Sequence, residues 1–330
     1  MTGRVAIVTG ANTGIGYQVA RYLAEGGNDV VMACRSIEKG KEAMNRIKAE
    51  YPNSLVQVME VDLSSMDSVR KFVKEFTRKK TRLNLLVNNA GMALNFKDQT
   101  RKTMREGFEV TMATNHFGPF LLSCLLIDYL IQTADIMGEA RIINVTCALH
   151  DHEHSWLSKD CGFLEVDNFQ LQKEGTFNGL QAYKNSKLCN VLLTYYLAEK
   201  LNNTHVTVNA IDPGIVPTTE LSRNANKTDR FLWLCCVHRC CRIAKKTTTP
   251  IKASLHICQL ADSEKYEGVT GKYFQNGHEE RSSVESYDKE LQEKVWKVTN
   301  RLTGARSMTL ANEDLEEISL NSHGSLDMIK

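Results

Sequence analysis

The chain has 330 residues and a nearly balanced charge, with 41 Lys and Arg against 39 Asp and Glu. This length is enough for one large α/β domain or two small ones, each with an ample core, so no metal or disulfide staple is needed. The sequence has no long basic run and no repeat of basic and aromatic residues, which argues against nucleic acid and favours a small ligand.

The first apolar run begins at Val5, is too short to cross a bilayer and follows no basic segment. We therefore expect neither a signal peptide nor an N-terminal anchor. Ten unevenly spaced cysteines fit no small secreted disulfide scaffold and favour reduced thiols. The expectation is a cytoplasmic protein, soluble or peripherally attached to intracellular membranes, and the sequence carries no signal for its oligomeric state.

Short apolar runs alternate with longer helical patterns up to about residue 275. The expected strands are residues 4–9, 29–34, 55–61, 83–88, 141–146 and 206–211. The expected helices are residues 15–27, 38–50, 68–76, 116–137 and 180–201, with another from Pro250. Strands that alternate with helices require right-handed crossovers and a parallel sheet covered on both faces. The sequence thus predicts a single-domain, Rossmann-like doubly wound α/β fold.

We place this domain at residues 1–304 and a variable lid at about residues 217–248. After Gly304 the apolar periodicity stops, and residues 305–330 have the polar, mildly acidic composition expected of a disordered tail.

Three glycines, Gly10, Gly14 and Gly16, lie between the first expected strand and the first expected helix. A helix N-terminus presents free N–H groups and a partial positive charge, and glycine lets a pyrophosphate approach the backbone closely. A tight turn that uses glycine only for positive φ is the alternative. The first strand–turn–helix unit of a doubly wound sheet is where dinucleotides bind, which favours a cofactor loop.

Arg35 ends the second apolar run, and no Asp or Glu occurs from Val30 to Ser36. A carboxylate there would accept hydrogen bonds from the adenosine ribose, whereas a guanidinium can pair with a 2′-phosphate. We therefore predict NADP(H) as the cofactor in preference to NAD(H). The alternative is an arginine that serves only as a surface charge.

Five motifs occur in a fixed order, namely "TGANTGIG", "NNAG" (residues 88–91), Asn115, "YKNSK" (residues 183–187) and "DPG" (residues 212–214). In these motifs the chain resembles the short-chain dehydrogenase/reductases over roughly residues 3–300. Together with "MACRS" and "LHDH" they resemble the retinol dehydrogenase-like branch of that family.

The resemblance implies a set of cofactor-binding residues. They are Gly10, Asn12, Thr13, Gly14, Ile15, Gly16, Arg35, Asp62, Asn89, Gly91, Tyr183, Lys187, Pro213, Gly214 and Thr218, with Thr219 a weaker candidate. Asp62 matches the family's contact to the adenine, and its alternative role is that of a helix N-cap. For Pro213 and Gly214 the alternative is a turn with no ligand.

Tyr183 and Lys187 are four residues apart in an expected helix and therefore share one face. A cation beside the phenol favours the phenolate, although a buried tyrosine next to a lysine that extends to the surface is the common alternative. The resemblance implies that Tyr183 transfers the carbinol proton while hydride moves to or from nicotinamide. It also implies that Lys187 holds the nicotinamide ribose and that Asn115 extends the proton relay.

The stretch "INVTCALH" departs from the branch, because Thr146 and Cys147 stand in two serine columns and Cys147 takes the place of the catalytic hydroxyl. A thiol is larger and donates hydrogen bonds more weakly, so we expect reduced or altered activity. Thr146 or Tyr183 could instead suffice, or the chain could be a catalytically weak NADP(H)-binding protein. Cys147 as a covalent nucleophile is disfavoured because nothing obvious lowers its pKa, although His150, His152 and His154 are near in sequence.

The segment "RFLWLCCVHRCCRIAKK" falls in the expected lid. Its apolar residues suit a cover over a lipophilic substrate, for which retinoids, steroids and isoprenoid alcohols or aldehydes are candidates. Its cysteines lack the usual zinc spacing, so we predict no metal site. Residues Phe231–Lys246 could contact anionic lipid, with cysteines available for palmitoylation and the chain acting as a lipid-surface adaptor. Packing of the lid on its own domain is the equal alternative.

Overall fold

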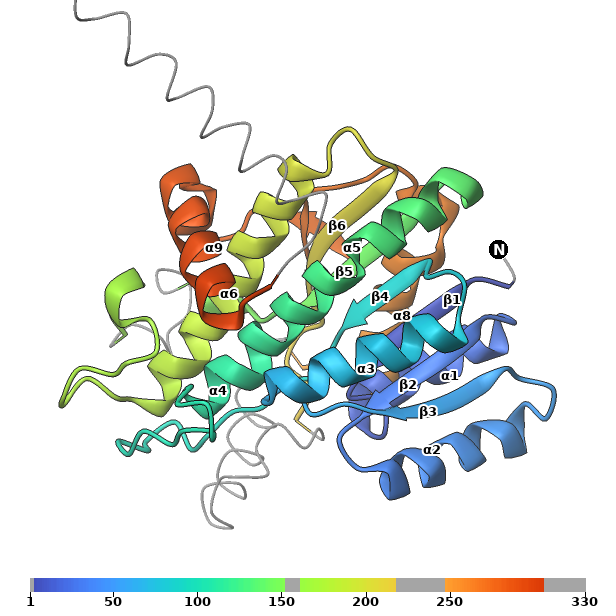
Figure 1. Ribbon diagram of the computed structural model, residues 1–330, viewed down its shortest axis with the longest axis horizontal. Coiled ribbons are helices and arrows are strands. Elements are labelled where there is room, and N and C mark those ends of the chain that lie inside the picture. Colours follow the sequence, from blue (N-terminus) through green and yellow to red (C-terminus); the bar gives the residue numbers. More distant parts are fainter. Residues whose placement is uncertain (1–2, 152–160, 218–246, 306–330) are drawn as a thin grey trace, which may run out of the picture.

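The computed structural model describes residues 3–151, 161–217 and 247–305 (Figure 1). The strands are β1 (Val5–Thr9), β2 (Asp29–Cys34), β3 (Val56–Glu60), β4 (Leu85–Asn88), β5 (Ala140–Val145), β6 (Val206–Asp212), β7 (Tyr273–Gln275) and β8 (His278–Glu280). The helices are α1 (Gly14–Glu25), α2 (Ile37–Glu50), α3 (Met66–Lys79), α4 (Val110–Met112), α5 (Gly118–Met137), α6 (Gly179–Lys200), α8 (Pro250–Asp262) and α9 (Lys289–Thr303). Short turns are the π-helical η1 (Ala113–Phe117) and the 3-10 helices η2 (Ala148–His150), η3 (Val166–Asn168), η6 (Glu264–Tyr266) and η7 (Val284–Tyr287).

The strands form one sheet in the order β3-β2-β1-β4-β5-β6-β7-β8. Pairing is parallel from β3 to β7 and antiparallel only between β7 and β8. This confirms the predicted doubly wound parallel sheet. The β7–β8 hairpin adds to the prediction, and it turns at Asn276 and Gly277, which both have positive φ. Such a pair is favoured in a two-residue hairpin turn because that turn needs left-handed backbone.

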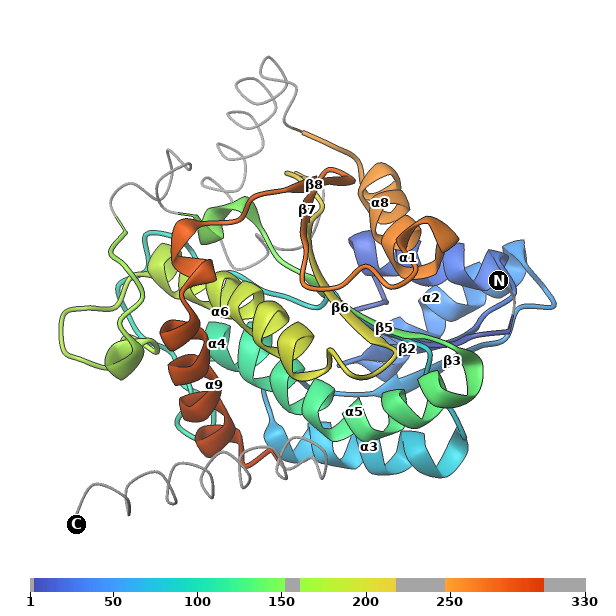
Figure 2. The same ribbon diagram turned by 90° about the horizontal axis from the view of Figure 1, so that it is seen from above.

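Both faces of the sheet are buried, as successive strand residues show. Ile7 belongs to the core on one side, while Ala6 and Val8 belong to the core on the other. Helices α1, α2 and α8 cover one face, and α3, α5 and α6 cover the other (Figure 2). Helix α9 packs on α6, so α6 is buried on nearly every side and lacks the amphipathic pattern of a surface helix.

The helix expected at residues 116–137 begins earlier, because α4, η1 and α5 form one continuous stretch, Val110–Met137. By length and composition alone this stretch could cross a membrane. More than half of its most apolar window is buried, and α5 packs on α3 and β5. Its apolar character is therefore accounted for by its place in the core layer.

The strand order reverses between β1 and β4, where the chain winds to opposite sides of the sheet. Parallel sheets of this kind bind ligands beyond the carboxyl ends of the strands at that reversal. The predicted motifs after β1, β2, β4, β5 and β6 all lie at this edge.

Candidate active site

The glycine turn after β1 leads into the N-terminus of α1. Gly10 and Gly14 have φ values of 65° and 59°, in the left-handed region that favours glycine. A Cβ on Gly16 would lie 2.5 Å from the Gly10 carbonyl oxygen, so no larger residue fits there. Thr13 precedes α1 without capping it through its side chain, whereas Ser36 caps α2. This turn with its uncapped helix N-terminus fits a bound pyrophosphate.

Thr9 at the end of β1 fixes the "NNAG" segment against this turn. Its Oγ1 accepts hydrogen bonds from the N–H groups of Asn89 and Ala90, each at 2.9 Å. The Asn89 side-chain amide donates to the Thr9 carbonyl at 2.8 Å. Asn89 and Gly91 are thereby brought beside the predicted cofactor loop. No role was predicted for Thr9, although its place directly before the glycines is a signal in the sequence that could have suggested one.

Arg35 and Asp62 follow the neighbouring strands β2 and β3. The Arg35 side chain is exposed, as a contact to a phosphate on the surface requires. Asp62 is half-buried, and its carboxylate accepts hydrogen bonds from the N–H and hydroxyl of Ser64. The alternative role of Asp62 as a helix N-cap is wrong. The chain first makes a turn in which the Ser65 N–H donates to the Asp62 carbonyl, and Ser65 then caps α3.

Tyr183 and Lys187 lie on one face of α6, as predicted, with the Lys187 Nζ 5.7 Å from the centre of the Tyr183 ring. Nζ also donates to the Val145 carbonyl at 3.1 Å. Burial lowers the pKa of Lys187 to about 8. Burial, with Cys147 and Asp212 nearby, raises the pKa of Tyr183 well above its usual value. The expected shift toward phenolate is therefore wrong for the cofactor-free protein, because burial favours the neutral phenol.

Asn115 lies in η1, and π-helical turns are frequent at functional sites. Its Oδ1 accepts from the Met92 N–H at 2.8 Å, and its Nδ2 donates to the Met92 carbonyl and to Ser186 Oγ. A Cβ on Gly91 would lie 3.4 Å from Lys187 Nζ and 3.5 Å from Asn115 Oδ1. Gly91, Asn115 and Lys187 are thus brought together.

A buried chain of hydrogen bonds reaches Asn115 from α9 and was not predicted. Asn190 Nδ2 donates to the Asn115 carbonyl at 3.0 Å, and Asn190 Oδ1 lies 3.2 Å from His116 Nδ1. His116 Nε2 in turn lies 3.0 Å from Thr299 Oγ1. Burial lowers the pKa of His116 to about 4, so the ring is neutral. No periodic pattern in the sequence marks Asn190, His116 or Thr299 as partners in this chain of hydrogen bonds.

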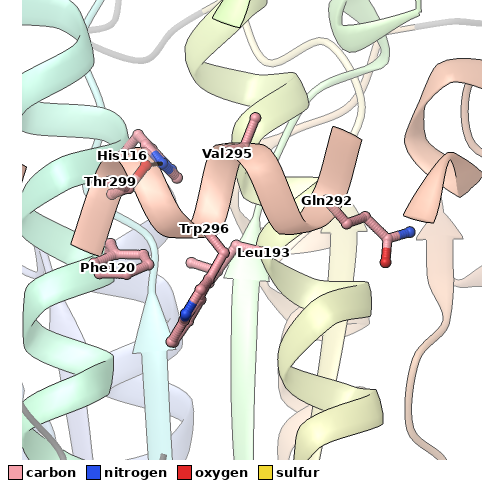
Figure 3. A pocket seen from close by; sticks show the side chains of 7 residues that line it. All are labelled: His116, Phe120, Leu193, Gln292, Val295, Trp296 and Thr299. Carbon is pink, nitrogen blue, oxygen red and sulfur yellow. Dashed lines mark hydrogen bonds between the residues drawn. The ribbon is translucent and has the colours of Figure 1, made fainter. Parts of the chain in front are cut away.

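The same region holds a small pocket between η1, α5, α6 and α9 (Figure 3). It is lined by His116, Phe120, Leu193, Gln292, Val295, Trp296 and Thr299. None of the predicted site residues lines it, so it belongs to the packing of α9 and not to the predicted active site.

Cys147 follows β5, is half-buried and forms a hydrogen bond with the Tyr183 side chain. Burial and the nearby Asp212 carboxylate raise its pKa to about 12, so the thiol is protonated. Thr146 is turned into the interior, where its hydroxyl donates to the Lys187 carbonyl at 3.0 Å. Of the two residues in the serine columns, Cys147 alone contacts Tyr183 in the residues that the structure describes.

Pro213 and Gly214 follow β6 at the same edge. Gly214 has φ 85°, and a Cβ there would lie 2.5 Å from Asn276 Oδ1. Five predicted or weighed positions or segments lie outside the described residues, namely Thr218, Thr219, His152, His154 and residues 231–246. The structure therefore does not bear on the cysteine-rich part of the lid or on the tail from residue 306.

The fold and the residues gathered at this edge define a dinucleotide-binding α/β enzyme. The chain belongs to the short-chain dehydrogenase family: residues 4–155 match the family model for short chain dehydrogenases. Retinol dehydrogenase 12 of Bos taurus is 38% identical over 305 residues, which cover 92% of this chain and 87% of the relative. Polyprenol dehydrogenase of Homo sapiens is 35% identical over 315 residues, which cover 93% of this chain and 87% of the relative. The resemblance noted in the sequence is confirmed, and the chain is an oxidoreductase.

Solved structures share the fold. An uncharacterised protein from Mycobacterium paratuberculosis has a TM-score of 0.68 at 23% identity, covering 92% of this chain and 95% of that one. The 3-ketoacyl-(acyl-carrier-protein) reductase from Brucella melitensis, in complex with NADH, has a TM-score of 0.63 at 20% identity. The match covers 83% of this chain and 96% of that one.

Proposed function

We propose that this protein is an NADP(H)-dependent oxidoreductase that interconverts an alcohol and a carbonyl on a lipophilic substrate such as a retinoid, steroid or isoprenoid. The observation that carries the proposal is the meeting of Tyr183, Lys187 and Asn115 with the glycine turn at one edge of the sheet. Relatives named for retinol and polyprenol support the class of substrate. The Phe96 ring, 5.9 Å from that of Tyr183, offers an apolar contact beside the reacting group.

The dinucleotide, when bound, supplies hydride to a carbonyl carbon or takes it from a carbinol carbon. Gly10, Gly14 and Gly16 leave room for its pyrophosphate, and Arg35 pairs with a 2′-phosphate. Tyr183 donates a proton to the substrate oxygen as that oxygen gains charge in reduction, and it accepts the proton in oxidation. Lys187 supplies the positive charge that stabilises the phenolate left by reduction.

Cys147 occupies the position from which a hydroxyl would stabilise the substrate oxygen. A protonated thiol is a weak donor, so this stabilisation is smaller than a serine would give. The same observation favours a second candidate function, that of a catalytically weak NADP(H)-binding protein.

Turnover of a panel of aldehydes and ketones with NADPH separates the two functions, and Tyr183→Phe is the decisive variant. We expect loss of turnover with nearly unchanged NADPH affinity, since only the proton donor is removed. A matched control is Tyr196→Phe on the same helix, whose ring stacks on Trp296. Full activity of Tyr183→Phe would contradict the acid/base role. Firm NADPH binding without turnover in the wild type across the panel would favour the second function.

A further inference from the structure

Asp212 ends β6 within the "DPG" motif, and the proposed function gives it no part. Its side chain is buried, with only 4% of the residue exposed. Oδ1 accepts a hydrogen bond from the Gly214 N–H at 2.9 Å. Oδ2 accepts from the Ala148 N–H at 3.2 Å and from Gln275 Nε2 at 3.0 Å. The carboxylate thus joins the segments that follow β5 and β6 to strand β7.

An aspartate that serves only its own turn would bond to the backbone two residues on, as Asp212 does with Gly214. The other two hydrogen bonds reach residues that are 64 and 63 positions away. A local turn therefore does not account for the buried carboxylate.

The hydrogen bond to Ala148 holds one end of the peptide group between Cys147 and Ala148. The other end is the Cys147 carbonyl, which lies 2.8 Å from His150 Nδ1. His150 Nε2 accepts from the Ser283 N–H at 3.1 Å, so Nδ1 carries the proton and donates. Asp212 and His150 together fix the peptide that sets where the Cys147 thiol lies relative to Tyr183.

The three donors to Asp212 are uncharged amides, so its hydrogen bonds bring no opposite charge to the carboxylate. That charge raises the pKa of Tyr183 and of Cys147. It also raises the pKa of Tyr273. For Lys187 and His150, burial lowers the pKa overall, and the Asp212 charge opposes that effect. The titratable groups near Tyr183 are Cys147, which follows β5, Asp212 at the end of β6 and Lys187 on α6. Inside a protein such charges act strongly because little water screens them.

We propose that Asp212 is a positioning residue for the active site: its buried carboxylate fixes the Cys147–Ala148 peptide and places a negative charge close to Tyr183 and Cys147. The proposal rests on the proposed function for Tyr183, while its effect on Cys147 does not depend on turnover.

The first test is the pH dependence of alcohol oxidation, in which the substrate loses hydride to NADP⁺ and its hydroxyl proton to Tyr183. Asp212→Asn keeps the side-chain shape and removes the charge, and its amide nitrogen can no longer accept from one of the N–H groups that bond to Asp212. We expect the pH of half-maximal oxidation to fall by about one unit. Gln275→Leu removes one donor and keeps the charge, so it should lower the melting temperature and leave this pH unchanged. A pH midpoint that is equal in wild type and Asp212→Asn would overturn the proposal.

The second test measures alkylation of Cys147 by iodoacetamide in the cofactor-free protein, followed by peptide mass spectrometry. Loss of the negative charge lowers the thiol pKa, so Asp212→Asn should react about tenfold faster at pH 8. Cys161, which is half-buried like Cys147, serves as the internal reference. Asp29→Asn, at the opposite edge of the sheet, is the matched control and should react as the wild type does.

These tests separate the two proposals. A wild type without turnover contradicts the proposed function, and the alkylation rate still decides the role of Asp212. An unchanged rate in Asp212→Asn overturns that role even in an active enzyme. If Asp212→Asn does not fold, Asp212→Ser replaces it under the same criteria.

Discussion

Arg35 carries the cofactor preference at the scale of a single side chain. Arg35→Ala should narrow the preference for NADPH over NADH by roughly ten- to a hundredfold, because it removes a charge-assisted contact to the 2′-phosphate. Calorimetric titration with both cofactors measures this, and NADH affinity should change little. Lys48→Ala, which removes an exposed charge on the following helix α2, is the control. Equal affinities of the wild type for the two cofactors would contradict the NADP(H) assignment.

Cys147 provides a second test at this scale. Cys147→Ser should raise carbonyl reduction with NADPH, by up to a hundredfold, because a hydroxyl is the better donor to an oxygen that gains charge. Steady-state kinetics should place the gain in kcat. Cys189→Ser is the control, since Cys189 lies on α6 and is buried in the hydrophobic core. A measurable rate that stays constant or falls in Cys147→Ser would mean that the site has accommodated the thiol.

At the scale of elements, the docking of α9 on η1 and α6 depends on a neutral His116. Its pKa is about 4 in the folded chain and about 6.5 when unfolded, so the unfolded state binds the proton first as the pH falls. His116 therefore favours folding above pH 6.5, and that contribution of about 3 kcal/mol is lost between pH 6.5 and 4.

The variant His116→Gln has no such titration. The free energy of unfolding of the wild type, minus that of His116→Gln, should fall by about 3 kcal/mol from pH 7 to pH 4. Urea unfolding at a series of pH values measures the difference. His278→Gln, at an exposed position on β8, is the control. A constant difference for His116→Gln as well would contradict the neutral, buried state of the ring.

At the scale of the whole molecule, a buried ionic cluster joins β1, β5 and α8 at the edge of the sheet opposite the active site. Glu139 pairs with Arg141 at 2.6 Å, and Arg4 lies between Glu139 and Asp262. Glu139→Gln removes the negative charge that faces the buried guanidinium groups of Arg4 and Arg141. It should therefore lower the free energy of unfolding by about 3 kcal/mol. Denaturant unfolding measures this, while kcat at low temperature should stay unchanged. Glu75→Gln, from an exposed pair with Lys79, should have almost no effect on stability. A large loss of kcat in folded Glu139→Gln would show that the cluster also shapes the active site.

The lid allows a further test at this scale. Ile215 and Thr247, near the two ends of the expected lid, form an isolated parallel β-bridge. Residues 218–246 lie outside the described residues. From their aromatic and basic composition we expect partial co-sedimentation with anionic liposomes, weakened by salt. A variant with Trp233, Arg239, Arg242, Lys245 and Lys246 replaced should lose it. Sedimentation of that variant as strong as the wild type would exclude the lid as the contact.

The sequence by itself determined the six strands from β1 to β6, most helices and the order of the motifs. Apolar alternation along β1 and β2 and the glycines before α1 are local signals, because backbone conformation and burial repeat over a few residues. Parallel winding then places the ends of β1, β4, β5 and β6 at one edge of the sheet. The roles predicted for Tyr183, Lys187 and Asn115 came from the resemblance of their motifs to the family.

Tertiary structure alone decided how distant polar groups meet. Thr299 lies 183 positions from His116, and Asp212 lies 64 positions from Ala148, so no local pattern could pair them. The three-residue strands β7 and β8 are too short for a periodic signal. The proton affinities of Tyr183 and Lys187 likewise depend on burial, which the packing of the whole chain sets. Residue types and spacing specify which groups are available, whereas desolvation and long-range hydrogen bonds determine their state.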